Sequence, residues 1–262
     1  MQLALAGDLQ AQCTASSYAM RELGVPFAGL FGACSTMAEG LALGAALCEG
    51  GAARNLLAMA SSHFCAAERQ FRTPLSYGAV RTPTAQWTAT AAGCCLLQPQ
   101  GEGVGIAAAT FGRVQDYQVK DINNMGAAMA PAAASTLLHY FKDTGTEPQE
   151  FDCIYTGDLG QVGSQLLREL LAAEGLLIKN HVDCGCILFD ANEQSVKSGG
   201  SGPGCCAAVL CGHILPRLRR GSQKRVLFTA TGALMSQTTF LQKETIPAVA
   251  HLVELRAPEK EK

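Results

Sequence analysis

Two stretches of this chain carry the same sequence pattern, and this internal repeat constrains the fold more than any other feature. AlaGlyAspLeu at residues 6–9 returns as ThrGlyAspLeu at residues 156–159. From Cys34 onward the two copies align without gaps, so that Cys34 matches Cys205 and Arg54 matches Arg225. One supersecondary unit is therefore used twice within the chain.

Each copy has the punctuation of strand, helix, strand, helix, strand. Thr36 and Glu39 have the spacing of a capping box, which predicts the start of the second helix in the first copy. The predicted strands are 3–6, 25–30 and 56–61 in the first copy and 154–157, 184–189 and 226–231 in the second, where helices are predicted at about 164–175 and 205–220. Strands that alternate with such helices predict parallel sheets covered on both faces.

The segment between the copies predicts two antiparallel strands, 87–97 and 104–114, around a polar loop rich in Gly and Pro. A predicted helix at about 127–142 then leads into the second copy. The first copy begins with its strand at Leu3 and has no counterpart of this extra strand and helix. Either an N-terminal strand and helix have been lost or the first half has a shorter sheet; we favour loss, because an exposed edge in the middle of a buried parallel sheet is costly. We therefore expect two halves, 1–125 and 126–262, of which the first lacks an N-terminal strand and helix.

Composition excludes several classes of function. The 262 residues are 48% hydrophobic and 16% charged, which suits one large α/β domain or two fused small ones. A net charge of −2 offers no positive field for nucleic acid. No apolar run reaches the roughly 18 residues of a membrane span, and the start lacks a signal-peptide pattern, so a cytoplasmic chain with its 12 cysteines reduced is expected.

Cys34 is the first candidate for chemistry. It follows a predicted strand and lies beside a helix start, where unpaired N–H groups and the helix dipole favour a thiolate or a bound anion. The alternative is a small buried hydrophobic side chain, which most cysteines of this chain must be.

Three more residues lie at predicted strand ends, where open α/β sheets bind ligands. Asp8 and Asp158 occupy equivalent positions in the two copies, and each either contacts a ligand or caps the following loop. His63 ends the SerSerHis run and is either a base near Cys34 or a hydrogen-bonded structural residue.

Two arginines follow in AlaGluArgGlnPheArg. Arg69 and Arg72 are three residues apart and share one face of a helix, so they either clamp a carboxylate ligand or form a solvated face. HisValAspCysGlyCys at 181–186 invites a zinc interpretation, but no second Cys pair has zinc spacing. No metal or cofactor site is predicted. No nucleotide site is predicted either, because GlyGlySerGlyProGly at 199–204 lacks the Lys of a P-loop.

A duplicated strand, loop, cysteine and helix resembles the thiolase and ketoacyl-synthase superfamily. The motifs PheGlyAlaCysSerThr, SerSerHis with AlaGluArgGlnPheArg, AsnMetGlyAlaAlaMetAlaProAlaAla, ThrGlyAspLeu, AspCysGly, GlyGlySerGly and AlaThrGlyAlaLeu together resemble the stage V sporulation protein AD family, from residue 1 to about 254. The resemblance implies a five-layer α/β/α/β/α sandwich of two similar halves, with this chain as an N-terminally shortened member.

The resemblance also implies a function. Condensing enzymes of the superfamily pair the cysteine with a His and an Asn or second His, whose expected places here fall near Gly157–Asp158 and Gly200, so we expect no competent condensing enzyme. The family implies binding of dipicolinic acid, with or without Ca²⁺, and its movement into the forespore and out on germination. The ligand-binding residues expected are Asp8, Cys34, Ser35, Ser62, His63, Arg69, Arg72 and Asp158.

Two other functions remain open at this stage: an active acyltransferase or ketoacyl synthase that uses Cys34, and a structural subunit with a vestigial pocket. The expected partners are other stage V sporulation A membrane proteins, which would hold the chain at the cytoplasmic face of the forespore or spore inner membrane. Superfamily members commonly form homodimers through the first-half sheet, an expectation that the shortened first half weakens.

Overall fold

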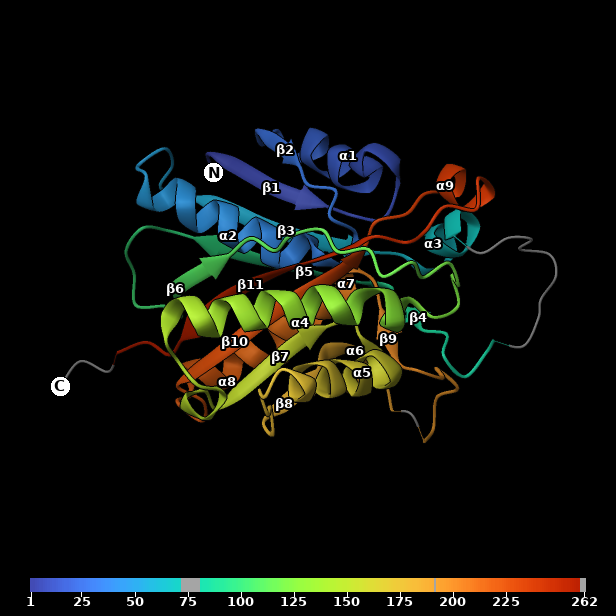
Figure 1. Ribbon diagram of the computed structural model, residues 1–262. Coiled ribbons are helices and arrows are strands. Elements are labelled where there is room, and N and C mark those ends of the chain that lie inside the picture. Colours follow the sequence, from blue (N-terminus) through green and yellow to red (C-terminus); the bar gives the residue numbers. More distant parts are fainter. Residues whose placement is uncertain (72–80, 191, 260–262) are drawn as a thin grey trace.

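Two twisted sheets form the frame of the protein (Figure 1). The computed structural model describes residues 1–71, 81–190 and 192–259, with the side chain of Arg69 left aside. The first sheet has the order β2-β1-β3-β5, in which β5 is antiparallel to β3 and the other pairs are parallel. Its strands are β1 (Leu3–Gly7), β2 (Phe27–Gly29), β3 (Leu56–Ser62) and β5 (Ala91–Leu97).

The second sheet has the order β6-β11-β10-β7-β8. Its strands are β6 (Gly105–Thr110), β7 (Cys153–Gly157), β8 (His181–Asp183), β10 (Arg225–Ala233) and β11 (Ala248–Arg256). The strands β8, β7, β10 and β11 repeat the order and directions of β2, β1, β3 and β5. The predicted duplication is therefore confirmed, with β6 as the extra strand of the second half.

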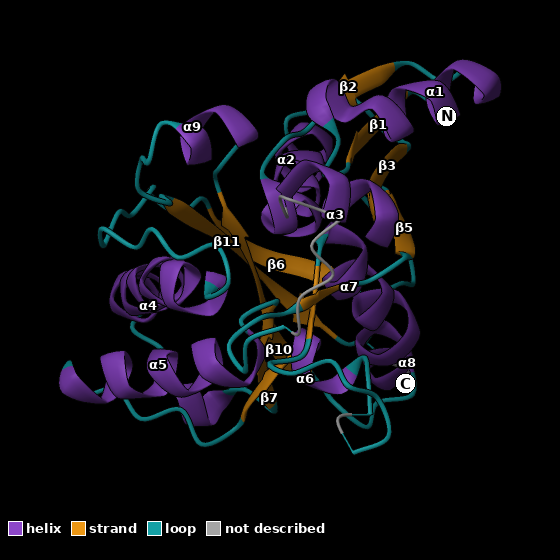
Figure 2. Cartoon of the chain, turned by 90° about the vertical axis from the view of Figure 1, so that its right-hand side faces the viewer, coloured by secondary structure: helices purple, strands orange, loops and turns teal. Residues whose placement is uncertain are grey.

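Helices fill three layers around the sheets (Figure 2). Between the sheets lie α2 (Thr36–Glu49) and a helical run made of α7 (Pro203–Val209), the π-helix η5 (Leu210–Ile214) and α8 (Leu215–Arg219). The outer layers are α1 (Thr14–Leu23) on the first sheet, and α4 (Met125–Thr144) with α5 (Gly160–Ala173) on the second. This is the expected five-layer α/β/α/β/α sandwich.

Short elements complete the chain. They are the 3-10 turns η1 (Ala11–Cys13), η2 (Ala33–Ser35) and η4 (Pro148–Glu150), the helices α3 (Phe64–Phe71), α6 (Cys184–Ile187) and α9 (Gln237–Leu241), and the paired strands β4 (Trp87–Thr88) and β9 (Gly200–Ser201). Among the described residues, no helix combines the length and hydrophobicity needed to cross a membrane.

Apolar side chains form one core between the two sheets and a second core between the second sheet and its outer helices. The inner core includes Met37, Leu41, Leu210 and Phe228, all of them buried. Because α2 and α7 are covered by a sheet on each side, they are apolar and rich in small residues all round. The site described below lies at one end of this buried middle layer.

Several predicted elements were wrong in detail. The segment predicted as a strand at 184–189 begins the short helix α6, because the Asp183 side chain accepts a hydrogen bond from Gly185 N and caps it. The predicted capping box at Thr36 does not form, since Thr36 is itself helical and its hydroxyl donates to Ala33 O. Pro216, which has no N–H to donate, follows the π-helical turns that interrupt the predicted helix 205–220.

The predicted antiparallel pair 87–97 and 104–114 was also wrong. β5 pairs with β3 in the first sheet, whereas β6 pairs with β11 in the second. The second sheet thus takes a strand from within residues 1–125, although the division into two halves at 125 and 126 stays a prediction. β11 itself was not predicted.

The shortened first half is visible at the edge of its sheet. In the described part of the chain, the four-stranded first sheet has no counterpart of β6 beside β5 and none of α4 over β3 and β5. The open place lies at the edge of the first sheet, beside β5. A groove remains there between α1 and the two strands, lined by residues that include Met20, Met59 and Cys94.

Candidate functional site

Cys34 lies where the first half meets the second. The chain leaves β2, turns through η2 and enters α2, and this turn holds Cys34 beside the first turn of the helix. The backbone of Gly32 packs so closely on β10 that a Cβ added at Gly232 would lie 2.2 Å from Gly32 O. Because both positions lack a side chain, the Cys34 turn can rest directly on a strand of the other half.

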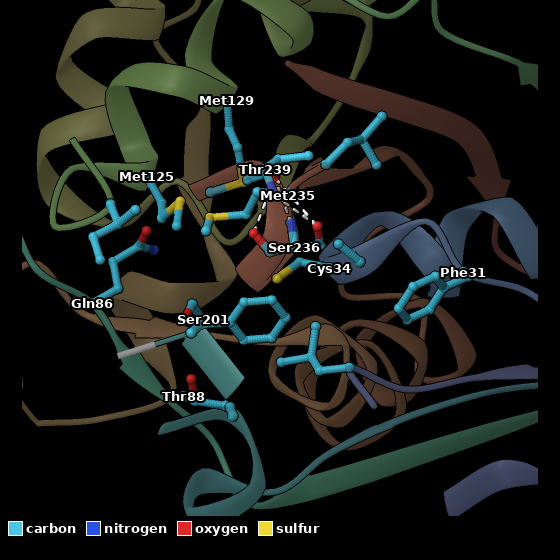
Figure 3. Close-up of a pocket in the computed structure, with 17 residues that line it drawn as sticks. Phe31, Cys34, Gln86, Thr88, Met125, Met129, Ser201, Met235, Ser236 and Thr239 are labelled. Atoms are coloured by element: carbon cyan, nitrogen blue, oxygen red, sulfur yellow. Dashed lines mark hydrogen bonds between the residues drawn. The ribbon is translucent and has the colours of Figure 1, made fainter. Parts of the chain in front are cut away.

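A cavity of about 300 Å³ opens beside Cys34. Figure 3 shows Met125, Met129 and Met235 on one side of Cys34, and Thr88 and Ser201 on the other. The lining residues come from both halves: Leu9, Phe31, Ala33, Cys34, Ala67, Phe71, Gln86, Thr88, Ile122, Met125, Met129, Ser201, Ala233, Leu234, Met235, Ser236 and Thr239. The walls are mainly apolar, and amide and hydroxyl groups supply most of their polar atoms.

Asp158 is the ionisable group that acts most strongly on the pKa of Cys34. It follows β7, its side chain is fully buried, and neither carboxyl oxygen has a hydrogen-bond partner in the described structure. Its backbone has φ +99°, a strained conformation for a residue other than glycine. Burial, and then the nearby Asp183, raise the pKa of Asp158 well above its usual value. Asp158 is therefore held as a neutral acid beside the cavity.

The thiol of Cys34 is also held neutral. Burial, followed by the charge of Asp158, raises the pKa of Cys34 well above its usual value, although the side chain is partly exposed to the cavity. The N–H groups at the start of a helix favour a thiolate, but desolvation of the sulfur outweighs them here. A thiol in this state is a poor nucleophile.

Asp183, in β8, organises the loop that carries Asp158. Its carboxylate accepts hydrogen bonds from Thr156 Oγ1, Leu159 N and Gly160 N at 2.7–2.9 Å, in addition to the bond from Gly185 N. Burial raises the pKa of Asp183, and these four donors act against that shift. The segment that suggested zinc therefore shapes the loop of Asp158.

Gln86 is a site residue that the sequence did not reveal. Its Nε2 donates to the carbonyl oxygens of Asp158, at 2.6 Å, and of Gly200, at 3.1 Å. It is 3% exposed and lines the cavity, so it ties a first-half segment to two loops of the second half. A lone Gln before a Trp carries no sequence signal, and the cavity methionines are equally ordinary in an apolar helix.

Five predicted residues do not line the cavity: Asp158, Asp8, Ser35, Ser62 and His63. The buried carboxylate of Asp8 accepts hydrogen bonds from Gln10 N, Ser16 N and Ser16 Oγ, so it holds the turn into α1. Ser35 Oγ donates to Gly32 O inside the turn of Cys34. Their roles as ligand contacts stay predictions.

Ser62 joins the two halves. Its hydroxyl donates to Ala89 O and accepts a hydrogen bond from Gly204 N at 3.1 Å. The next residue, His63, is exposed and does not line the cavity. The structure therefore brings Asp158 within electrostatic reach of Cys34, but Cys34 lines the cavity while Asp158, Ser62 and His63 do not.

The predicted arginine pair cannot be placed in full. Arg69 belongs to α3, whose neighbours Ala67 and Phe71 line the cavity, but its side chain and the whole of Arg72 lie outside the described residues. Arg81 is engaged elsewhere, since its Nη2 lies 2.8 Å from Glu68 Oε1 and its guanidinium stacks on Trp87. The described lining contains no Lys, Arg or His.

The sequence is similar to a known family along nearly its whole length. Residues 1–256 match the family described as stage V sporulation protein AD. The stage V sporulation protein AD of Bacillus subtilis (strain 168) is 44% identical over 250 residues, which are 95% of this chain and 74% of that protein.

Solved structures support the fold alone, because their sequence identities are low. The 3-oxoacyl-(acyl carrier protein) synthase III from Pseudomonas aeruginosa PAO1 superposes with a TM-score of 0.58 and 14% identity, over 99% of this chain and 77% of that one. Cerulenin-bound OleA from Xanthomonas campestris gives a TM-score of 0.62 and 14% identity, over 98% and 73%. These thiolase-like neighbours confirm the fold class, and the match over residues 1–256 shows that this chain belongs to the stage V sporulation protein AD family.

Proposed function

We propose that this protein binds dipicolinic acid in the cavity beside Cys34 and does not use Cys34 as a nucleophile. In this proposal it acts within the sporulation system that moves dipicolinate into the forespore and releases it on germination. The observation that carries the proposal is the neutral thiol of Cys34 at the wall of a mainly apolar cavity, with the fully buried Asp158 raising its pKa.

The chemistry of the wall argues against condensation. A cysteine nucleophile reacts as its thiolate and needs a neighbouring base and donors for the developing oxyanion. Here Asp158 raises the pKa of Cys34, whereas a histidinium would lower it. Gly200, the other position at which a donor was expected, has no side chain and lies in β9.

The size and polarity of the cavity suit a small flat ligand. Ligand pockets in proteins usually measure about 300–1,000 Å³, so this cavity is at the small end of the range. The methionines can pack on both faces of a ring, because their unbranched side chains adapt to its shape. The hydroxyls of Thr88 and Ser201 offer donors to carboxylate oxygens, whereas both N–H groups of the Gln86 amide already donate to backbone carbonyls.

Dipicolinate is a dianion, so its entry into the cavity requires that its negative charge be neutralised. A neutral Asp158, which is buried behind the cavity lining, removes one source of repulsion. Among the described lining residues no cation is present, so the proposal assigns neutralisation to Arg69 and Arg72 or to Ca²⁺ that enters with the ligand. Family membership alone supports the proposed membrane partners and the location at the cytoplasmic face of the forespore membrane.

Calorimetric titration of the full chain with dipicolinate, with and without Ca²⁺, tests the proposal. Ala233→Leu, which fills part of the cavity, should weaken binding at least about tenfold, equal to about 1.4 kcal/mol. Ala107→Leu, on the exposed side of β6, is its matched control. Absence of heat at millimolar ligand, or equal affinity of both variants, contradicts binding in this cavity.

A second pair of variants tests the predicted clamp. Arg72→Ala should weaken dipicolinate binding, while Arg113→Ala, at an exposed position, should not. If Arg72→Ala binds as well as wild type but Ca²⁺ is required, the ion supplies the positive charge. Unchanged affinity without Ca²⁺ removes both sources of neutralisation and with them the proposed binding mode.

An acyltransferase is the second candidate, because the apolar wall beside Cys34 also suits an acyl chain. Incubation with an acyl-CoA followed by intact-protein mass spectrometry separates the two functions. The proposed function expects no adduct. A stable acyl adduct that disappears in Cys34→Ala and persists in Cys65→Ala, an exposed cysteine, would establish the enzyme instead.

A further inference from the structure

A second group of thiols lies away from the cavity, where β5 packs on the central helical run. Cys95 in β5 and Cys211 in the π-helix η5 place their sulfur atoms 3.9 Å apart. They belong to different halves of the protein and are separated by 116 residues. Both side chains are partly exposed, so a small solute can reach them.

The contact is built by a match between strand and helix spacing. Gly93 packs on Ala207, where an added Cβ would lie 2.5 Å from Ala207 O. Two residues along a strand cover about 6.6 Å and four residues along a helix cover about 6 Å, so the next pair in register is Cys95 and Cys211. The absence of a side chain at Gly93 lets the strand and the helix approach closely enough for the thiols to meet.

The two thiols differ in reactivity. A hydrogen bond between the thiols of Cys95 and Cys211 lowers the pKa of Cys211 to about 7; burial opposes this shift, while a backbone hydrogen bond at Cys94 and the charge of Arg219 support it. The same hydrogen bond, together with burial, raises the pKa of Cys95. Near neutral pH a substantial fraction of the pairs therefore holds a thiolate on Cys211 beside a thiol on Cys95.

We propose that Cys211 is a peroxide-reactive cysteine and that Cys95 is its resolving partner. The Cys211 thiolate attacks one oxygen of hydrogen peroxide, the O–O bond breaks, and the released hydroxide takes a proton to become water. Cys211 is then a sulfenic acid. The Cys95 sulfur attacks the Cys211 sulfur, the S–O bond breaks, and the hydroxyl leaves with the Cys95 proton as a second water. Two thiols are oxidised to one disulfide and one peroxide is reduced to two waters.

The movement that the disulfide requires is small. The sulfurs must close from 3.9 Å to about 2 Å, within the range of a side-chain rotation on each partner. Cys94 is the natural competitor, because it is adjacent and exposed, but successive residues of a strand point to opposite faces. The resulting crosslink would join the first sheet to the middle layer of the sandwich.

Exposure of the full chain to equimolar hydrogen peroxide, followed by alkylation and mass spectrometry of the monomer, tests the proposal. Wild type and Cys94→Ser should lose two hydrogen atoms, regain them with dithiothreitol, and give a crosslinked peptide joining β5 to η5. Cys95→Ser and Cys211→Ser should lose this crosslink. Cys95→Ser should instead accumulate a sulfenic acid on Cys211, which dimedone labels.

Three outcomes would overturn the proposal. The first is a β5 to η5 crosslink that survives in Cys95→Ser, which would assign the reaction to Cys94. The second is oxidation of wild-type Cys211 to a sulfinic acid without a disulfide. The third is a Cys211 thiol that resists peroxide while exposed Cys65 reacts. Because serine is nearly isosteric with cysteine at these partly exposed positions, all variants are expected to fold.

Discussion

The carboxyl group of Asp158 acts on the thiol of Cys34: after burial of the sulfur, the charge of Asp158 is the next cause that raises the pKa of Cys34. The reverse effect has the opposite sign, since Cys34 lowers the pKa of Asp158, which burial and Asp183 hold well above its usual value. Both groups therefore favour their protonated forms, and the thiolate of Cys34 is disfavoured.

Asp158→Asn should release the thiol from this constraint. Where alkaline pH ionises Asp158, its charge raises the pKa of Cys34 further; the amide cannot ionise, so iodoacetamide should alkylate Cys34 faster in the variant at alkaline pH. The rate at Cys65, which is exposed, serves as the internal reference. Equal Cys34 rates in the two proteins would show that burial alone sets this pKa.

The same substitution predicts a pH-dependent gain in stability. Since the pKa of Asp158 is higher in the folded than in the unfolded chain, the folded state retains a proton above about pH 4 that the unfolded state releases. Wild-type stability therefore falls as pH rises above that value. Urea unfolding should find Asp158→Asn more stable than wild type at pH 7, with the difference vanishing towards pH 4.

Gln86→Ala should destabilise the junction between the halves. The substitution leaves the buried carbonyls of Asp158 and Gly200 without their amide donor, a loss of about 1–3 kcal/mol in the free energy of unfolding. Gln98→Ala removes an amide that bonds Asn55 on the exposed surface and should cost below about 0.5 kcal/mol. Denaturant unfolding of both variants measures the contrast.

Arg225→Met should be among the most damaging single changes outside the site. Arg225 Nε lies 2.8 Å from Glu254 Oε1, and Glu254 is 2% exposed, so the substitution leaves a buried charge and should cost about 3–5 kcal/mol. Arg256 contacts the same carboxylate from a side chain that is 56% exposed, and Arg256→Ala should cost about 1 kcal/mol or less.

Glu254 also makes the stability of the fold decrease at acid pH. Burial would raise the pKa of Glu254, but bonds from Arg225, Tyr140 and Arg256 prevail and lower it to about 2, against an unfolded value near 4.5. A lowered pKa contributes stability above the unfolded value, which is lost as pH falls from 4.5 to 2, and amounts to about 3 kcal/mol. Arg225→Met should lack most of this acid-dependent loss, which unfolding between pH 5 and pH 2.5 measures.

His181 should make the fold sensitive at milder pH. Burial, and then Arg168, lower the pKa of His181 from 6.5 to about 4, and its Nε2 lies 2.8 Å from Thr156 Oγ1. The unfolded chain therefore binds a proton first, and stability falls as pH drops from 6.5 to 4, by about 2 kcal/mol at pH 5. His181→Gln should flatten the unfolding free energy between pH 7 and pH 5; an unchanged slope would contradict this assignment.

Local patterns in the sequence predicted the duplicated unit and most of its strands. They failed for β6, whose partner β11 lies far away in the chain, because alternation of residues shows that a strand exists but not which strand it joins. They failed at residues 184–187 because one side chain, Asp183, caps a helix there. Such choices depend on tertiary contacts that a short window does not contain.

The sequence likewise predicted only part of the candidate site. Cys34 could be identified because it lies between a strand and a helix start, and Asp158 because it follows a glycine at a repeated strand end. Gln86 could not, since its role comes entirely from two carbonyls more than seventy residues away. Asp8, equivalent to Asp158 by repeat, has an ordinary structural partner in Ser16, so equivalent positions have separate roles in the two halves.

The contact between the backbones of Gly32 and Gly232 has a consequence for how a ligand is received. Because no side chain lies between them, the turn of Cys34 and the end of β10 form a rigid wall of the cavity. The methionine side chains on the opposite wall are the ones that can adjust to the shape of a ligand. A ligand is therefore accommodated by movement of one wall of the cavity alone. A conformational change on ligand binding would pass from the cavity through α4, which carries Met125 and Met129, towards the outer surface of the second half.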